Sequence, residues 1–268
     1  MKLTVLLDNN TYIDQYFVGE PGLSFYIEDE DKKILFDTGY SHVFIENAKK
    51  MEIDLNQLTH IVMSHGHNDH TRGLIYLAKQ YDLGETMMVA HPDCFMPKRE
   101  GKEEIGSSMG EEEIRSLCQY RPTSKTIALT KRLIFLGEIP QSIDFEQRQP
   151  IGEIKKDKWE SDYVLEDSAL VYRSEKGLFI ITGCSHSGIC NIIEYAKKVT
   201  KEEKVYGVIG GFHLLETGER LTKTITYFVE QELKEIYPCH CVCFHAKAKI
   251  NEQIPIHEVG VGLSIEIQ

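Results

Sequence analysis

The stretch Ser64-His65-Gly66-His67-Asn68-Asp69-His70 decides how this sequence is interpreted, because it holds three histidines and one aspartate within six residues. It follows an apolar run at residues 58–63, which predicts a β-strand that ends where the motif begins. Side chains two residues apart at a strand end point the same way. His65 and His67 are therefore expected to reach one metal ion.

Asp69 and His70 lie one step further round the predicted loop, where they can serve a second metal ion. Imidazole and carboxylate ligands suit Zn²⁺ first, with Fe, Mn, Co or Ni as alternatives. Gly66 and Gly73 support this interpretation, because glycine permits the tight backbone of a ligand loop. A merely solvated polar loop is disfavoured by the density of ligand residues. We therefore expect a divalent-metal centre, with two zinc ions as the first choice.

The composition describes a globular protein and limits its partners. The chain has 268 residues, 41% of them hydrophobic and 27% charged, with 30 Lys and Arg against 42 Asp and Glu. The resulting net charge of −12 repels nucleic-acid phosphates, and no basic patch offsets it. We expect a small-molecule substrate and metal cations as partners, with no nucleic acid and no membrane. The oligomeric state stays open.

Two features predict a cytoplasmic location. The first apolar run, residues 3–7, stops at Asp8 and is too short for a signal peptide or a membrane span. Three of the seven cysteines, Cys239, Cys241 and Cys243, alternate along one predicted strand and cannot readily bridge one another. Reduced thiols are the expected state.

Strands and helices alternate in a pattern typical of a layered α/β sandwich. A meander of strands is followed by strand–helix alternation, twice over, and a last strand is expected before Phe244. The predicted strands are residues 3–7, 22–28, 33–36, 58–63, 87–90, 168–172, 178–182 and 205–209. The predicted helices are 41–51, with Ser41 as its cap, 73–81, 187–199 and 221–236.

Residues 92–160 differ from the rest, because they are rich in Lys, Glu, Gly and Ser and show weak periodicity. We interpret this range as an inserted cap or lid within a single domain spanning residues 1–268.

The His-x-His-x-Asp-His motif resembles the signature of the metallo-β-lactamase fold superfamily, and Ile34-Leu35-Phe36-Asp37-Thr38-Gly39 is similar to its early strand and turn. The segments Gly183-Cys184-Ser185-His186-Ser187-Gly188-Ile189-Cys190-Asn191 and Gly210-Gly211-Phe212-His213-Leu214 resemble one branch. That branch comprises metal-dependent hydrolases related to 7,8-dihydropterin-6-methyl-4-(β-D-ribofuranosyl)aminobenzene-5′-phosphate synthase. The resemblance implies a four-layer αβ/βα sandwich over nearly the whole chain.

Further ligands are expected at the ends of later strands. His186 follows the strand at 178–182 as a metal ligand or a capping histidine, and His213 follows 205–209 as a ligand or a substrate donor. The resemblance implies that His240 closes the second metal site. The branch usually shows Pro-x-His-Cys-Thr-Gly there, whereas this chain has Val242-Cys243 in place of Thr-Gly. His245 is expected to be a surface or loop histidine.

This set of residues favours hydrolysis of an ester or phosphoester bond. Two cations lower the pKa of a shared water and neutralise charge on the attacked oxygen, and Asp69 ligates the second metal and orients the hydroxide. A substrate linked to pterin and phosphoribose is implied by the resemblance only.

Other interpretations stay open. Three histidines and a carboxylate can hold Fe(II), as in a mononuclear iron dioxygenase. The departure at Val242-Cys243 would suit a binding or sensing protein without turnover. Cys239, Cys241 and Cys243 could form a thiolate site, although such cysteines are more often small buried hydrophobes. A nucleophilic Cys184 is disfavoured, because no third group orients it.

Overall fold

The computed structural model describes residues 1–268, which divide into two compact units. Unit 1 comprises Met1–Ser124, Gln149–Glu166 and Gly260–Glu266. Unit 2 comprises Lys125–Arg148, Asp167–Val259 and Ile267–Gln268. Each unit contains a main β-sheet and helices, as the sequence predicts.

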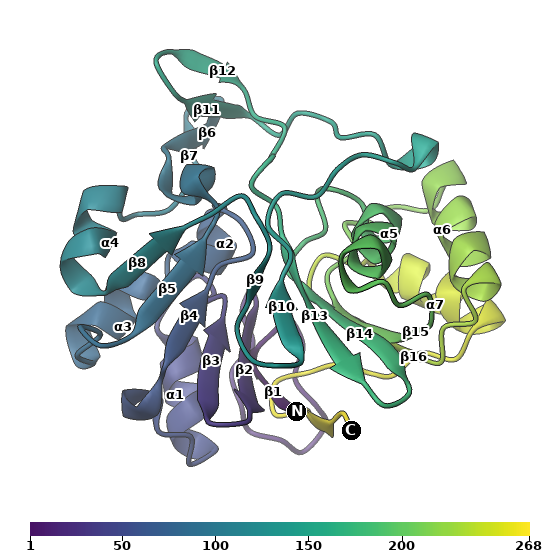
Figure 1. Cartoon of the computed structure of the whole chain (residues 1–268), viewed down its shortest axis with the longest axis horizontal. Helices are drawn as coiled ribbons and strands as arrows, with labels where there is room; N and C mark the ends of the chain where they lie inside the picture. Colours follow the sequence, from purple (N-terminus) through teal and green to yellow (C-terminus); the bar gives the residue numbers. More distant parts are fainter. The chain divides into compact units, whose positions relative to one another are not determined.

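The main sheet of unit 1 has seven strands in the order β17-β1-β2-β3-β4-β5-β8 (Figure 1). Neighbouring strands are antiparallel from β17 to β3 and parallel from β3 to β8. Its strands are β1 (Lys2–Leu7), β2 (Ser24–Asp29), β3 (Lys32–Phe36), β4 (His60–Val62), β5 (Met87–Ala90), β8 (Gln119–Pro122) and β17 (Ser264–Glu266). Because β3 and β4 are parallel neighbours, the loops that follow them begin at the same edge of the sheet.

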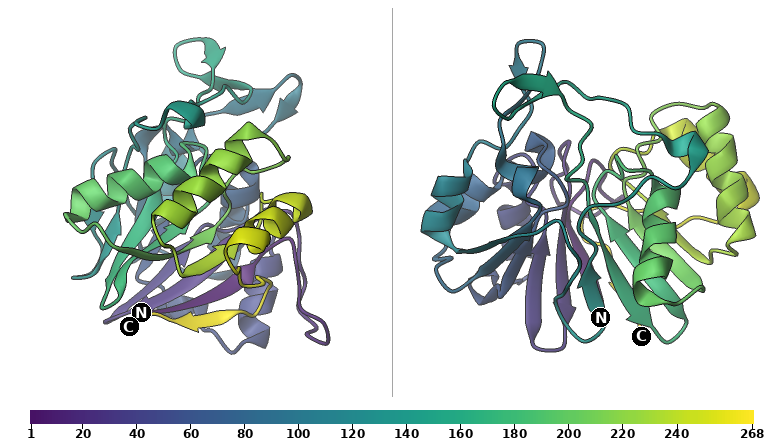
Figure 2. Two further views of the ribbon diagram at one scale, coloured as in Figure 1. Left: turned by 90° about the vertical axis from the view of Figure 1, so that its right-hand side faces the viewer. Right: turned by 45° about the horizontal axis from the view of Figure 1, so that its top comes forward.

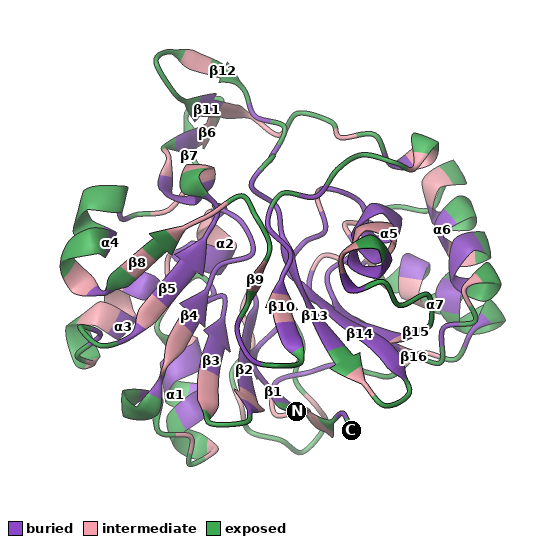
Figure 3. Ribbon diagram, in the orientation of Figure 1, coloured by how far each residue is buried: buried purple, intermediate pink, exposed green.

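Helices cover one face of this sheet and bury an apolar core. Phe44 and Leu77 pack from two helices against Leu35, Ile61 and Met88 of three strands. The helical segments of unit 1 are α1 (Val43–Lys50), η1 (Leu55–Gln57), α2 (Asn68–Thr71), α3 (Leu74–Gln80), η2 (Pro92–Phe95) and α4 (Glu111–Leu117). Their outer faces are exposed, whereas β4 and β5 are mostly buried (Figure 3).

A second, small sheet of unit 1 has the strand order β12-β11-β6-β7 (upper part of Figure 1). Its strands are β6 (Lys98–Glu100), β7 (Glu103–Glu104), β11 (Glu153–Lys155) and β12 (Trp159–Ser161). The range 92–160 is thus not one separate insert: β8 extends the main sheet of unit 1, and other strands of the range belong to unit 2. That the range covers a pocket as a lid stays a prediction.

The main sheet of unit 2 has the order β16-β15-β14-β13-β10-β9, with β14, β15 and β16 parallel. Helices α5, α6 and α7 pack on it and share one apolar core with its strands (Figure 2). The strands are β9 (Ile127–Ala128), β10 (Leu133–Phe135), β13 (Ala169–Ser174), β14 (Gly177–Thr182), β15 (Val205–Gly210) and β16 (Glu235–Pro238). The helical segments are η3 (Asp144–Glu146), α5 (Ile189–Thr200), α6 (Glu219–Glu230) and α7 (Phe244–Gln253).

Two helix predictions need correction. The helix expected to continue to Ile236 ends at Glu230, because Glu232 takes a left-handed conformation (φ 52°) and Ile236 joins the buried strand β16. The N-cap of α1 is His42 and not Ser41. The Ser41 hydroxyl instead donates to the Glu20 carboxylate, at 2.7 Å, while it accepts a hydrogen bond from the Val43 amide.

The three alternating cysteines do not lie on a strand. Strand β16 ends at Pro238, and His240 has a φ of 48°, which turns the chain out of the extended conformation. Cys243 then serves as the N-cap of α7, a helix that the sequence pattern did not indicate. All seven cysteines are present as thiols. None of the helices combines the length and apolar character needed to cross a membrane.

Candidate metal centre

The histidine motif begins directly beyond β4, as predicted, and its first two histidines lie together. His65 Nε2 lies 3.2 Å from His67 Nδ1, and the two rings meet edge to face. The ring of His70 lies against that of His65, with centroids 4.2 Å apart. All three side chains are buried.

The Asp37 carboxylate organises this group from the end of the neighbouring strand β3. Its Oδ1 accepts a hydrogen bond from the Ser64 amide at 2.7 Å, and its Oδ2 accepts one from the Ser64 hydroxyl at 2.6 Å. The same Oδ2 lies 2.7 Å from His70 Nδ1. Asp37 is itself fully buried and has a left-handed backbone conformation (φ 60°), which is uncommon outside functional sites and turns.

These contacts fix where the ring protons are. A carboxylate only accepts hydrogen bonds, so His70 Nδ1 carries the proton that Asp37 receives. The Ser64 hydroxyl uses its single proton on Asp37, so the Ser64 oxygen accepts from His65 Nδ1 at 2.9 Å. The lone pairs of His65 and His70 are therefore both on Nε2, as in histidines that bind a metal through that nitrogen.

His67 is held in the neutral form that a metal ligand needs. Burial lowers the pKa of His67 to about 4, and the nearby Lys98 and His70 act in the same direction. Neutral imidazoles with a fixed tautomer are the usual ligands of divalent transition metals. The donors of unit 1 therefore fit such an ion.

Asp69 and His70 lie in a short helix, α2, and not in the open loop that the sequence suggested. His67 is the N-cap of this helix, and its carbonyl accepts hydrogen bonds from the amide and the hydroxyl of Thr71. The Asp69 carboxylate is 30% exposed and lies 3.8 Å from His70 Nε2. It is thus the ligand candidate of this unit that solvent reaches most easily.

The two glycines beside the motif are needed for close packing and not for a special φ. A Cβ atom at Gly66 would lie 2.3 Å from the Cys94 carbonyl oxygen, and one at Gly73 would lie 2.0 Å from that of Thr38. Real Cβ atoms do not approach another heavy atom this closely. Any larger residue would displace the backbone that carries the histidines.

A buried charged network behind the motif was not expected from the sequence. The Lys98 ammonium lies 2.6 Å from an Asp162 oxygen and 2.8 Å from a Glu166 oxygen, with all three side chains buried. The same Glu166 oxygen accepts a hydrogen bond from the Gly66 amide. Burial raises the pKa of Glu166, while the Lys98 charge opposes this shift. The network therefore holds the backbone between His65 and His67.

Unit 2 gathers its candidate residues in three loops, one after each of the parallel strands β14, β15 and β16. Each loop has one non-glycine residue in a left-handed conformation: Ser185 (φ 59°), His213 (φ 48°) and His240 (φ 48°). Such conformations cost about 1–3 kcal/mol each and concentrate at functional sites. The His186 ring stacks obliquely on the His213 ring, with centroids 4.6 Å apart.

Cysteine sulfurs connect these loops. Cys241 Sγ accepts a hydrogen bond from the His213 amide at 3.4 Å and donates one to the Cys184 carbonyl at 3.5 Å. Cys243 Sγ instead accepts from the Ala246 amide within the cap of α7. The cysteines of this segment thus have separate structural contacts, which disfavours an independent thiolate site.

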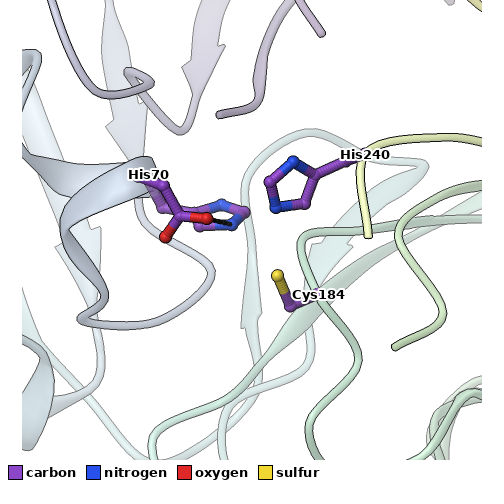
Figure 4. Close-up of side chains that lie close together, drawn as sticks. His70, Cys184 and His240 are labelled. Atoms are coloured by element: carbon purple, nitrogen blue, oxygen red, sulfur yellow. Dashed lines mark ion pairs between the residues drawn. The ribbon is translucent and has the colours of Figure 1, made fainter. Parts of the chain in front are cut away.

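Cys184 is a further candidate ligand in unit 2. Its sulfur and a ring nitrogen of His240 lie within 4.8 Å of each other. Figure 4 shows the Cys184 side chain pointing toward the His240 ring, and it also labels His70 of unit 1. A thiolate beside an imidazole is a common zinc ligand pair. The exposed His245 lies on α7 and faces solvent, as predicted.

The structure thus brings the predicted residues together in two sets. Within unit 1 these are His65, His67, Asp69 and His70, and within unit 2 His186 lies beside His213, while His240 lies near Cys184. Their assignment as metal ligands or substrate contacts stays a prediction. Asp37 and Cys184 join these sets without a role assigned from the sequence, as do the charged residues behind the motif, although Asp37 and Cys184 both lie in segments that carry the family resemblance.

Comparison with known proteins identifies the family. The family model of the metallo-beta-lactamase superfamily matches residues 18–197. An uncharacterized protein of Methanocaldococcus jannaschii, MJ0448, is 34% identical over 255 residues, which cover 93% of this chain and 94% of that protein.

Two further relatives bear on the branch. The 7,8-dihydropterin-6-methyl-4-(beta-D-ribofuranosyl)-aminobenzene-5'-phosphate synthase of the same organism is 31% identical over 269 residues, covering 94% of this chain and 91% of that enzyme. The crystal structure of Tm1679, described as a metal-dependent hydrolase of the beta-lactamase superfamily, superimposes with a TM-score of 0.85 at 29% identity. That match covers 100% of this chain and 99% of the other.

These matches confirm both the predicted α/β fold class and the resemblance to the dihydropterin-related branch. Proteins of this fold bind divalent metals, and the histidine and aspartate groups described above are candidate ligands. On the evidence of its histidine motif, its sheets and its relatives, the chain belongs to the metallo-β-lactamase superfamily.

Proposed function

We propose that this protein is a metal-dependent hydrolase that cleaves an ester or phosphoester bond in a small molecule. The observation that carries the proposal is the Asp37 carboxylate, which leaves Nε2 of His65 and of His70 as the lone-pair nitrogens. A buried carboxylate that orients two neighbouring histidines in this way is the usual support of a catalytic metal centre.

The proposed site holds two divalent ions, with zinc first and iron or manganese as alternatives. The residues that would hold them are His65, His67, Asp69, His70, His186 and His240. The bound ions supply a water that ionises near neutral pH and positive charge for the attacked oxygen.

Two other side chains of the chain have roles in this proposal. Asp69 is only partly buried and lies beside His70, so its second oxygen can orient the attacking water and receive its proton. His213 Nδ1 is buried and makes no hydrogen bond within the protein, which suits a donor to the substrate. The net charge of −12 supports a small substrate over a polynucleotide.

Metal analysis combined with an activity screen tests the proposal. Purified protein is expected to hold one or two transition-metal ions per chain and to hydrolyse at least one compound among phosphodiesters, phosphomonoesters, lactones and thioesters. The variant His67→Ala should lose metal and activity. The matched variant His60→Ala, which alters a half-buried histidine on β4, should keep both.

Three results would contradict the proposal. Full metal content and turnover in His67→Ala would exclude the ligand assignment. Iron together with oxygen uptake would favour the redox alternative. Metal binding without turnover of any compound in the screen would favour a binding protein.

A synthase reaction is the second candidate, favoured by the 31% identity to an enzyme with that name. The test supplies a reduced pterin with a leaving group at its 6-methyl carbon together with 4-(β-D-ribofuranosyl)aminobenzene 5′-phosphate. Mass spectrometry should then detect the joined product with the wild type and not with His67→Ala. Hydrolysis of the pterin compound alone would instead support the first candidate.

A further inference from the structure

The loop between β1 and β2 in unit 1 carries the most exposed apolar side chains of the molecule. Ile13 is 93% exposed, Tyr16 is 86% exposed, and Val18 beside them is exposed as well. These three residues form the apolar tip of the loop, which is drawn in purple in Figure 2. A single exposed apolar residue is ordinary, whereas a group of them marks an interaction surface.

The apolar tip is not needed to fasten the loop, because two aromatic rings of the loop do so. Tyr12 and Phe17 are partly buried. A Cβ atom at Gly262 would lie 2.6 Å from the Phe17 ring, and one at Gly260 would lie 3.3 Å from the Tyr12 ring, so both rings pack closely against the segment that precedes β17. The side chains of the tip instead stay in water, although burying them would be favourable.

Hydrogen bonds to helix α1 hold the backbone of the tip in place. The buried Asn47 side chain accepts from the Val18 amide at 3.1 Å and donates to the Val18 carbonyl at 2.8 Å. The Lys50 ammonium donates to the Tyr16 carbonyl at 3.1 Å. The tip is therefore ordered before any partner binds, which lowers the entropy cost of a contact.

Two exposed charges of opposite sign flank the tip. Asp14 lies between Ile13 and Tyr16 in the sequence, and the Lys50 ammonium lies at the Tyr16 carbonyl. Neither charge forms an ion pair within the chain. A patch with one free anion and one free cation is complementary to a second copy of itself, since a two-fold contact can place each charge opposite the other.

A lipid surface suits this patch less well. Anionic membranes attract clusters of about four or more basic residues. The tip has one lysine beside it, and the net charge of −12 repels an anionic surface.

We propose that the apolar tip is a self-association surface, at which two copies of this chain meet about a two-fold axis. Ile13 and Tyr16 of one copy pack against the same residues of the other, and Asp14 of each copy faces Lys50 of the other. The contact is small, so the expected dimer is weak, with a Kd of about 1–100 µM. This inference does not depend on the proposed function.

Sedimentation velocity of the full chain between about 1 and 200 µM tests the proposal, because the dimer fraction of wild type should rise over this range. Ile13→Asp should raise the Kd by about tenfold or more, since each substitution occurs twice in a two-fold dimer. Leu165→Asp is the matched control. It makes the same charge change at an exposed apolar residue of unit 1 that lines a separate hollow with residues of β11 and β12, and it should keep the wild-type Kd.

Charge reversal tests the pairing across the two-fold axis. Asp14→Lys and Lys50→Glu should each raise the Kd by about fivefold. An equimolar mixture of the two variants should form a heterodimer about as tight as the wild-type dimer, because both cross-contacts then join opposite charges. Lys49→Glu is the control, since the Lys49 ammonium binds the Gln80 side chain, and it should not alter the Kd.

Circular dichroism of each variant checks that the fold is retained. The left-handed Asp14 (φ 60°) can be replaced by lysine, because Lys201 takes the same conformation (φ 57°) in this chain.

Three results would overturn the proposal. The first is a wild-type protein that stays monomeric up to about 200 µM, the weak end of the affinity range for specific contacts of this size. The second is a mixture of the two charge variants that associates no more tightly than either variant alone. The third is a monomer that co-sediments with vesicles of phosphatidylcholine and phosphatidylserine, which would assign the tip to a lipid surface.

Discussion

Asp37 Oδ2 lies 2.7 Å from His70 Nδ1, although the two residues are 33 positions apart in the chain. The same oxygen receives the Ser64 hydroxyl proton, so one carboxylate sets the tautomers of both His65 and His70. Because Asp37 is fully buried, this arrangement does not compete with water. The carboxylate is therefore a positioning residue for two candidate metal ligands.

Replacing Asp37 by Asn tests this role. An amide can present an N–H group to His70 Nδ1–H, and two donors that face each other cannot bond. We expect Asp37→Asn to lower metal affinity by about 10–100-fold, measured by competition with a chelator of known affinity. Asp29→Asn, which alters another buried aspartate of unit 1, is the control and should retain wild-type affinity. Equal affinity of Asp37→Asn and wild type would contradict the assignment.

The stability of the metal-free protein should fall as the pH is lowered from about 6.5 to 4. Burial lowers the pKa of His67 from 6.5 to about 4 in the folded chain. Between these values the unfolded chain binds the proton and the folded chain does not, so stability is present above pH 6.5 and lost as the pH falls. The shift corresponds to about 3 kcal/mol, to be measured by urea unfolding in the presence of a chelator.

A comparison with His67→Leu isolates this effect, because leucine does not titrate. As the pH falls from 7 to 4, the unfolding free energy of wild type should decrease relative to that of His67→Leu. A difference that is constant from pH 7 to pH 4 would show that His67 does not cause the loss.

Substitution of His240 tests the ligand that the sequence resemblance implied. We expect His240→Ala to lower metal content and to reduce kcat by about 10²-fold or more, since one cation's stabilisation of charge is lost. His245→Ala is the matched control, because His245 is exposed on α7, five residues further along the chain. If His245→Ala releases metal and His240→Ala does not, the site closes through the later histidine.

Glu146 gives a prediction that does not depend on metal. Its buried carboxylate accepts a hydrogen bond from the backbone amide of Asn191 at 2.9 Å. Burial raises the pKa of this carboxyl group. Because the unfolded chain loses this proton near pH 4.5 and the folded chain only at a higher pH, stability falls as the pH rises from about 4.5 to the raised pKa. Glu146→Gln stays neutral, so its stability relative to wild type should increase between pH 4 and pH 8.

Urea unfolding at the two pH values measures this change. Glu203→Gln, at an exposed position, should show no pH-dependent difference from wild type. A relative stability of Glu146→Gln that falls with rising pH would contradict the raised pKa.

Local sequence was sufficient to predict most strands of the two main sheets and the first half of the site. Residues two apart at a strand end share a direction whatever the rest of the chain does, so His65 and His67 could be paired from their spacing. The buried strands β14 and β15 were likewise evident, because continuous apolar runs are typical of parallel strands covered on both faces. The Val-Cys departure at residues 242–243 carries no such local signal, yet Cys243 caps α7 there.

Tertiary structure alone decided the role of Asp37, the proximity of Cys184 to His240, and the end of β16 before the alternating cysteines. Asp37 reaches Ser64 because β3 and β4 are parallel neighbours, and Cys184 lies near His240 because three parallel strands end at one edge of their sheet. Such contacts depend on strand order and on left-handed residues at the strand ends. Neither is encoded in the period of the hydrophobic pattern, since both follow from how distant segments satisfy their backbone hydrogen bonds together.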